Sequence, residues 1–115
     1  MSFTYLASPY SPVGEHSPEQ RHLLRQARYE QVCAKAAELM LKHELIFCPI
    51  AHSHPIEQKM DGIKDGNFWL LQDFAILAAA SKVKVYRMEG WEQSYGVRKE
   101  IEFAHAHGIP VEYID

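Results

Sequence analysis

The sequence predicts a single α/β domain of three layers, in which helices cover both faces of a mostly parallel sheet of four to five strands. Three observations support this prediction. Short runs rich in β-branched and aromatic residues alternate with longer segments of helical periodicity. No hairpin signal joins two of these runs, so the order β-α-β-α-β-α-β is typical of a parallel sheet. The chain has 115 residues, enough for one domain and too few for two. The expected architecture is flavodoxin- or Rossmann-like.

Composition narrows the classes of function. Hydrophobic residues make up 47% and charged residues 23% of the chain, which is typical of a globular domain. The net charge is −3, and the 12 basic residues are scattered, so polymeric nucleic acid is not an expected partner. The longest wholly apolar run, residues 74–80, is much shorter than the roughly 20 residues that cross a bilayer. With no signal-peptide pattern at the N-terminus, we expect a cytoplasmic protein that does not bind membranes.

In the first half of the chain, the elements begin with a strand over residues 3–7 that ends at Ser8-Pro9. A proline-rich loop follows. Ser17 is then a candidate N-cap, with Pro18 in the first helical position and Gln20 completing a capping box. This helix is predicted to continue to about His43, with an apolar stripe made of Tyr29, Cys33, Ala36, Ala37, Met40 and Leu41. Residues 45–50 form the second predicted strand, and both cysteines, Cys33 and Cys48, are expected to be buried thiols.

The second half begins with residues 51–66, which hold one proline, two glycines and two histidines without clear periodicity. These features predict a functional loop or a broken short helix. A helix is expected over residues 67–80, a strand over 83–87 and a loop over 88–93. Ser94 is the candidate N-cap of a last helix that continues to His107, where Gly108 closes it. Residues 109–114 form the last predicted strand.

The expected functional edge is formed by the loops that follow the strands. In parallel sheets of this kind, ligands bind beyond the carboxyl ends of the strands. The loops over residues 8–17, 50–66 and 88–94 should therefore lie together around one site.

Two carboxylates are candidates for catalysis. Glu100 lies in the second turn of the helix after Ser94, and the alternative is that it belongs to a solvated acidic face. Asp73 is surrounded in sequence by Leu70, Phe74 and other apolar residues, which favours a raised pKa and a role as an acid. Its alternative is a solvent-facing position on an amphipathic helix. Enzymes that cleave glycosidic bonds typically use a pair of carboxyl groups, one ionised and one protonated.

Histidines and tryptophans supply further candidates. His52 and His54 would share one side of an extended segment, where they could hydrogen-bond a substrate or, in the alternative, bind a metal. Trp69 and Trp91 could stack on a nucleobase, although core or interface positions are the alternative for each. The loop after the first strand has neither dinucleotide-binding nor Walker spacing.

The order of these residues resembles that of the nucleoside 2-deoxyribosyltransferase superfamily, which includes the 2'-deoxynucleoside 5'-phosphate N-hydrolases. The similarity lies in Tyr5-Leu6-Ala7-Ser8-Pro9-Tyr10, in Asp73 on a helix before a strand, and in Ser94-x-Gly96-x-x-x-Glu100-Ile101. It extends over residues 3–111 and is greatest to an uncharacterised small bacterial branch.

The resemblance implies a role for each matching residue. Glu100 would be the nucleophile, Asp73 the acid that protonates the departing base, and Tyr5 the group that orients Glu100. Ser94 and Gly96 fall where phosphate-recognising members bind a 5'-phosphate. Ser8, Pro9, Tyr10 and Ser11 in the first loop are also expected to bind the substrate. His52, His54 and Trp69 are expected to do so from their residue types, and the loop of the two histidines has no assigned counterpart in the superfamily. The chain departs from the pattern at Ser11, where the phosphate-binding members have an arginine, and at Ser81, where an aspartate is common.

We therefore expect an N-glycosidase or (deoxy)ribosyltransferase that acts on a nucleoside or nucleoside 5'-monophosphate and requires no metal or organic cofactor. One alternative is a nucleotide-binding module of the same fold without catalysis, and another is a metal hydrolase built on His52 and His54. The apolar helix over residues 69–80 and the related enzymes, whose sites are completed by a neighbouring subunit, predict a homodimer or larger homo-oligomer, which light scattering would measure.

Overall fold

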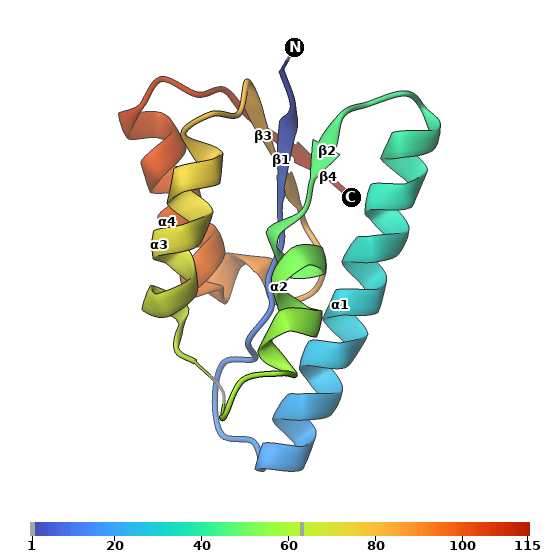
Figure 1. Ribbon diagram of the computed structural model, residues 1–115, viewed down its shortest axis with the longest axis vertical. Coiled ribbons are helices and arrows are strands. Elements are labelled where there is room, and N and C mark those ends of the chain that lie inside the picture. The colour runs from blue at the N-terminus through green and yellow to red at the C-terminus, as the bar shows by residue number, and fades with distance from the viewer. Residues whose placement is uncertain (1, 63) are drawn as a thin grey trace.

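A four-stranded parallel sheet forms the centre of the domain. The computed structural model describes residues 2–62 and 64–115. Strands β1 (Thr4–Ala7), β2 (Ile46–Phe47), β3 (Lys82–Tyr86) and β4 (Val111–Ile114) lie in the order β2-β1-β3-β4 (Figure 1). All three pairings are parallel, with Tyr5 opposite Phe47 on one side and Val83 on the other. The predicted three-layer α/β class is confirmed, and the structure adds the strand order, which the sequence left open.

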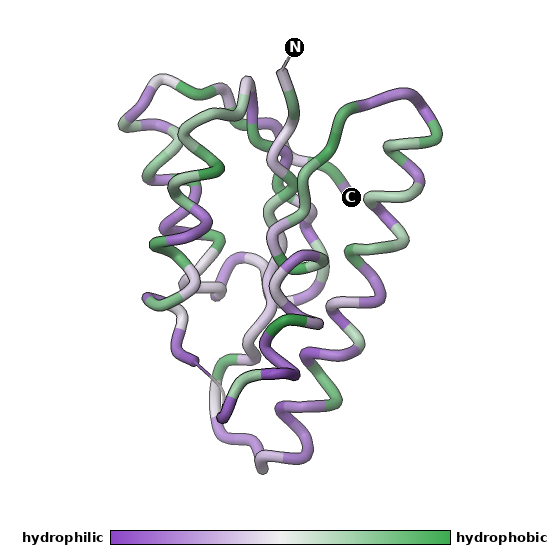
Figure 2. The backbone as a smooth tube through the Cα atoms, in the orientation of Figure 1, coloured by the Kyte–Doolittle hydropathy of each residue, from purple (hydrophilic) through white to green (hydrophobic). Residues whose placement is uncertain are grey.

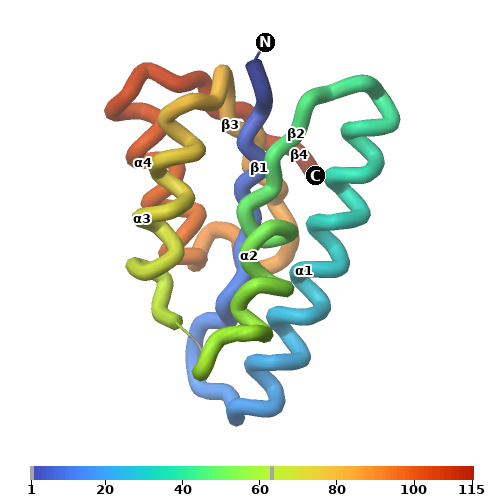
Figure 3. Tube along the Cα trace, viewed as in Figure 1, coloured from blue at the N-terminus to red at the C-terminus, as the bar shows by residue number. Residues whose placement is uncertain are grey.

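Helices cover both faces of this sheet. Helices α1 (Pro18–Leu41) and α2 (Pro49–Glu57) pack together on one face, and α3 (Gly66–Leu77) and α4 (Tyr95–Ala106) pack together on the other (Figure 1). A 3-10 turn, η1 (Trp91–Gln93), precedes α4. Figure 3 shows α1 running along the length of the domain, from the loop after β1 to the turn before β2.

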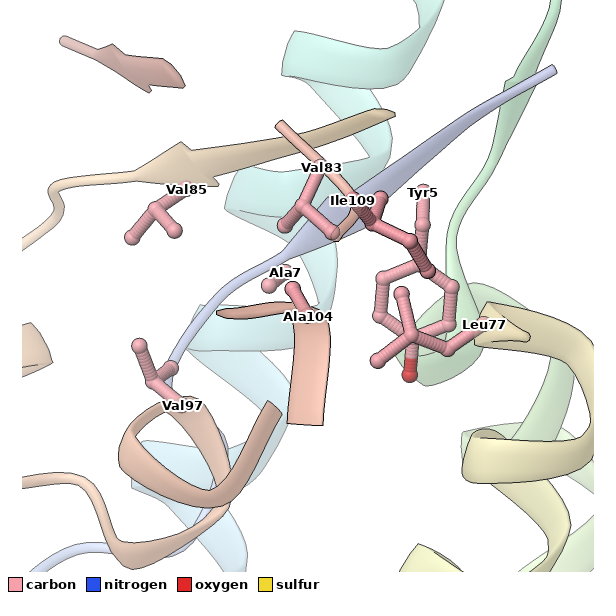
Figure 4. Packing of buried hydrophobic residues seen from close by; sticks show 8 residues of the cluster. All are labelled: Tyr5, Ala7, Leu77, Val83, Val85, Val97, Ala104 and Ile109. Atoms are coloured by element: carbon pink, nitrogen blue, oxygen red, sulfur yellow. The ribbon is translucent and has the colours of Figure 1, made fainter. Parts of the chain in front are cut away.

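Strand β1 divides the hydrophobic core into two parts because successive side chains of a strand point to opposite faces. Leu6 packs with residues of α1 and its neighbours, namely Val32, Ala36, Leu39, Cys48 and Met88. Tyr5 and Ala7 face the other layer, where they pack with Leu77, Val83, Val85, Val97, Ala104 and Ile109. Figure 4 shows the Tyr5 ring beside Leu77, with its hydroxyl oxygen at the end away from the strand. The part of the core that packs between the sheet and helices α3 and α4 therefore contains the hydroxyl group of Tyr5.

The predicted helix ends are confirmed where local sequence determines them. Ser17 Oγ accepts from the amide of Gln20, whose side chain accepts from the Ser17 amide, so the capping box is complete. Ser94 Oγ accepts from the amide of Val97 and caps α4. Gly108 follows the last helix with φ 68°, a left-handed conformation that glycine adopts without strain.

Two predictions about the second strand are corrected. The strand has two residues instead of six, because Pro49 in the first helical position begins α2 directly after it. Cys48 is therefore the N-cap of α2 rather than part of a strand. Of the two alternatives for residues 51–66, a functional loop or a broken short helix, the structure has the short helix as far as Glu57, with Pro55 inside it.

The buried stripe of α1 is also rotated from the predicted one. The helix buries Val32, Ala36 and Leu39, whereas Met40 is exposed and Leu41 is 82% exposed. Cys33, expected to be buried, is half-buried, while Cys48 is buried. Figure 2 shows hydrophilic and hydrophobic stretches alternating along α1, as expected for a helix with one face on the sheet.

Across the described residues, none of the helices is both long enough and apolar enough to span a membrane. On α3, Leu71 is exposed although it lies in the most apolar helix of the chain. Self-association through this helix remains a prediction.

Candidate active site

A cavity of about 280 Å³ opens at the carboxyl ends of the strands. Its walls come from the loop after β1, from α2 along its whole length, from the first turns of α3 and from the beginning of α4, with Arg25 added from α1. Most of the residues expected at the site line it: Ser8, Tyr10, Ser11, His54, Trp69, Asp73, Ser94, Gly96 and Glu100. The three expected loops therefore meet around one cavity, at the edge where parallel sheets bind ligands.

Glu100 is buried at the base of this cavity. It lies in the second turn of α4, is 4% exposed, and accepts a hydrogen bond from the hydroxyl of Tyr5 on β1. This burial excludes the alternative in which Glu100 belongs to a solvated acidic face. Burial raises the pKa of Glu100 to about 8, against the lowering effect of the Tyr5 hydrogen bond.

Asp73 contributes a second carboxyl from α3. It is partly buried and lines the cavity rather than facing solvent, and burial raises its pKa to about 7. The charge of Asp73 also raises the pKa of Glu100, so the two carboxyls affect each other's ionisation. Both groups therefore titrate near neutral pH, as expected of carboxyls with an acid-base role.

The Tyr5 hydroxyl opposes the effect of burial on Glu100. Even with this hydrogen bond, the pKa of about 8 for Glu100 and of about 7 for Asp73 place the last proton of the pair on Glu100. Interacting groups share their protons, so a minor form with Glu100 ionised and Asp73 protonated exists beside the major one. A hydroxyl that donates to Glu100 stabilises this minor form. Burial and the negative charge of Glu100 raise the pKa of Tyr5, so Tyr5 stays a donor.

His54 holds Tyr10 at the cavity wall. Its Nε2 donates to Gln26 Oε1 over 2.9 Å, so its Nδ1 accepts from the Tyr10 hydroxyl over 2.6 Å. The His54 ring also stacks on Tyr29 with centroids 4.1 Å apart, and burial lowers the pKa of His54. His54 is therefore a neutral ring with a hydrogen bond at each nitrogen, and it fixes the position of Tyr10.

His52 does not join His54. The prediction that both face one side of an extended segment is wrong, because they lie on helix α2, where residues two apart point in different directions. His52 is exposed and packs near Phe47, outside the cavity. Pro9 is also outside the cavity lining, since it is fully buried in the core. Within residues 2–62 and 64–115, no group of three or more His, Cys, Asp or Glu side chains could hold a metal ion.

Two polar groups in the cavity wall lack protein partners among the described residues. Ser8 Oγ is buried without a hydrogen bond, in a residue that is 6% exposed. Arg25, from α1, donates from Nε to Ser11 Oγ over 3.3 Å, while its buried Nη1 has no acceptor. A buried guanidinium nitrogen without an acceptor is costly, and both side chains line the cavity, so a ligand oxygen would satisfy them.

The first turn of α4 adds backbone donors to the same cavity. Ser94 and Gly96 line it, and the Ser94 side chain is occupied by the amide of Val97. The amides at the start of a helix have no intrahelical acceptors, and the helix dipole favours negative charge there. This turn therefore suits an anionic group of a ligand.

The cavity residues that sequence analysis missed include two charged side chains that are not exposed, Arg25 and Glu57. A signal for Arg25 was present, because Arg21, Arg25 and Arg28 recur on one face of α1. All three donate to the loop after β1, with Arg21 reaching Pro12 and Gly14, and Arg28 reaching the carbonyl of Tyr10. Glu57 had no such signal, since the segment around it has no clear periodicity and was predicted only as a loop or a broken short helix.

Comparison with known proteins identifies the family. The family model described as a domain of unknown function, DUF1937, matches residues 2–115. The chain therefore belongs to this family. Among curated proteins, no match is found.

Proposed function

We propose that this member of the DUF1937 family is an N-glycosidase or (deoxy)ribosyltransferase that acts on a nucleoside or a nucleoside 5'-monophosphate. One observation carries the proposal: a buried glutamate that accepts a hydrogen bond from Tyr5 shares a cavity with a second carboxyl, Asp73. Paired carboxyls with opposite protonation states are what glycosidic cleavage requires. The resemblance to the 2-deoxyribosyltransferase superfamily adds support from the sequence.

In the proposed first step, the ionised carboxylate of Glu100 attacks the anomeric carbon of the sugar. The bond between this carbon and the base nitrogen breaks, and its electron pair goes to the base, which takes the proton of Asp73. The Tyr5 bond to Oε2 fixes the carboxylate and leaves Oε1 for the attack.

In the second step, water or a second base attacks the same carbon and displaces Glu100. Asp73, now ionised, takes the proton of the attacking group, which returns both carboxyls to their starting states. Two displacements at one carbon retain the anomeric configuration. The two steps use only the groups described above.

The unpartnered donors support a 5'-monophosphate over a free nucleoside. The resemblance predicts an arginine at position 11, where this chain has Ser11. Arg25 hydrogen-bonds Ser11 Oγ, so a guanidinium from α1 lies beside that position. Arginine and serine donors, with the first turn of α4, suit the three terminal oxygens of a phosphoryl group.

The test is a chromatographic screen for free base. Purified protein is incubated with nucleosides and 5'-monophosphates, with and without a second base, beside Glu100→Ala and the surface control Glu102→Gln. We expect base release that Glu100→Ala abolishes and Glu102→Gln leaves unchanged. Equal release by wild type and Glu100→Ala would refute the role of Glu100, and nucleotide binding without any release would favour the non-catalytic module.

A further inference from the structure

Glu57 is a buried carboxylate that the two-step reaction does not use. It is the last residue of α2 and is only 6% exposed. The end of a helix carries partial negative charge, which makes it an unfavourable position for an acid. A carboxylate kept there needs compensating partners, and the partners of Glu57 lie across the cavity wall on α3 and the segment before it.

Both hydrogen bonds of the Glu57 side chain are accepted by the same carboxylate oxygen. Oε2 accepts from the indole Nε1 of Trp69 over 2.9 Å and from the backbone amide of Lys64 over 3.3 Å. The described residues give Oε1 no hydrogen bond, and Glu57 lines the cavity. The carboxylate thus fixes the indole with one oxygen and offers the lone pairs of the other to a ligand.

The indole lies beside the group that protonates the departing base. Trp69 and Asp73 are four residues apart on α3, so their side chains occupy the same face of the helix, and both line the cavity. A base that receives its proton from Asp73 must therefore leave next to the Trp69 ring. Aromatic side chains stack on any base, so Trp69 supplies affinity without choosing among bases.

We propose that Glu57 and Trp69 form the subsite for the leaving base, and that Glu57 selects bases with an exocyclic amino group. Trp69 packs against the plane of the base, and Glu57 Oε1 accepts a hydrogen bond from the amino group. An oxo group at the same place would bring its acceptor oxygen next to the acceptor oxygen of Glu57, with no hydrogen between them. The assignment of the base to this cavity rests on the proposed function, whereas recognition of an amino group by Glu57 can be measured without catalysis.

The experiment measures binding of free adenine and free hypoxanthine, which differ in an amino or oxo group at one ring position. The protein carries Trp91→Phe, which leaves Trp69 as the one remaining tryptophan and replaces a residue packed against Tyr113 outside the cavity. Quenching of Trp69 fluorescence reports binding. Glu57→Gln keeps an oxygen that can accept from the indole but replaces the free carboxylate oxygen by an amide donor. Glu92→Gln, on the exposed 3-10 turn, is the matched control.

We expect adenine to bind the protein that retains Glu57 at least tenfold more tightly than hypoxanthine, and Glu57→Gln to reduce this ratio at least tenfold. Glu92→Gln should leave the ratio unchanged. The same ratio with and without Glu57→Gln, or no quenching by adenine, would overturn the proposal. Amino-selective binding without base release in the chromatographic screen would leave this subsite standing and refute the N-glycosidase instead.

Discussion

Replacing Glu100 by glutamine should stabilise the protein at neutral and alkaline pH while it abolishes activity. Burial raises the pKa of Glu100 from its ordinary 4.5 to about 8, so the folded state retains a proton that the unfolded state releases between these values. The free energy of unfolding therefore falls as pH rises through this window. Glutamine is neutral at every pH and still accepts from the Tyr5 hydroxyl, so Glu100→Gln does not undergo this loss.

The size of the effect follows from the pKa. Each pH unit inside the window changes the contribution of Glu100 to the free energy of unfolding by about 1.4 kcal/mol. The free energy of unfolding of Glu100→Gln, relative to that of wild type, should therefore increase by roughly 3 to 4 kcal/mol between pH 5 and pH 8. Any cost of burying the new amide group is the same at both pH values and cancels in this comparison. Asp73 is present in both proteins, so its own titration largely cancels as well.

Urea unfolding followed by circular dichroism gives the free energies, provided that wild type and variant show equal m-values. Glu102→Gln is the control, because Glu102 is exposed on the same helix and makes only a surface ion pair with Lys99. Its stability relative to wild type should be nearly the same at pH 5 and pH 8. If the difference between Glu100→Gln and wild type is also the same at both pH values, Glu100 is not protonated in the folded state and the argument from burial is wrong.

Three further predictions concern the reaction. Asp73→Asn should slow base release by roughly 10²- to 10⁴-fold. Because the active form has Asp73 protonated and Glu100 ionised, wild-type activity should peak between their pKa values of about 7 and about 8 and fall at higher pH, and the variant should lose this decline, as a pH-rate profile would show. Tyr5→Phe should raise the pKa of Glu100 by removing its donor, and so lower the maximum of the profile and move its alkaline limb to higher pH; an unmoved limb would contradict the role of Tyr5. Arg25→Gln should raise KM for 5'-monophosphates about ten- to hundredfold and leave nucleosides unaffected, while Arg87→Gln, outside the cavity, should change neither.

Local sequence was sufficient for the parts of the fold that depend on near neighbours. The caps at Ser17 and Ser94 and the turn at Gly108 each involve groups within a few residues of each other, so composition and spacing predict them. The chemical character of Asp73 was also visible, because apolar neighbours in sequence indicate a buried environment.

Features that depend on distant contacts were not predictable. Pro49 could end a strand or begin a helix, and only packing against α1 and β1 decides for helix α2. Because the segment after Pro49 was predicted only as a loop or a broken short helix, neither the separation of His52 from His54 nor the position of Glu57 followed from the sequence. The contact of Arg25 joins helix α1 to Ser11, 14 positions earlier in a proline-rich loop whose path has no simple periodicity.

The covalent step is open to direct observation. Protein mixed briefly with a nucleoside 5'-monophosphate that it cleaves would be quenched in acid and analysed by intact-mass and peptide mass spectrometry. We predict an added mass equal to the sugar phosphate, attached to the peptide that contains Glu100 and absent from Glu100→Gln. Base release without any such adduct, and at the same rate in Glu100→Gln, would contradict a glutamate nucleophile.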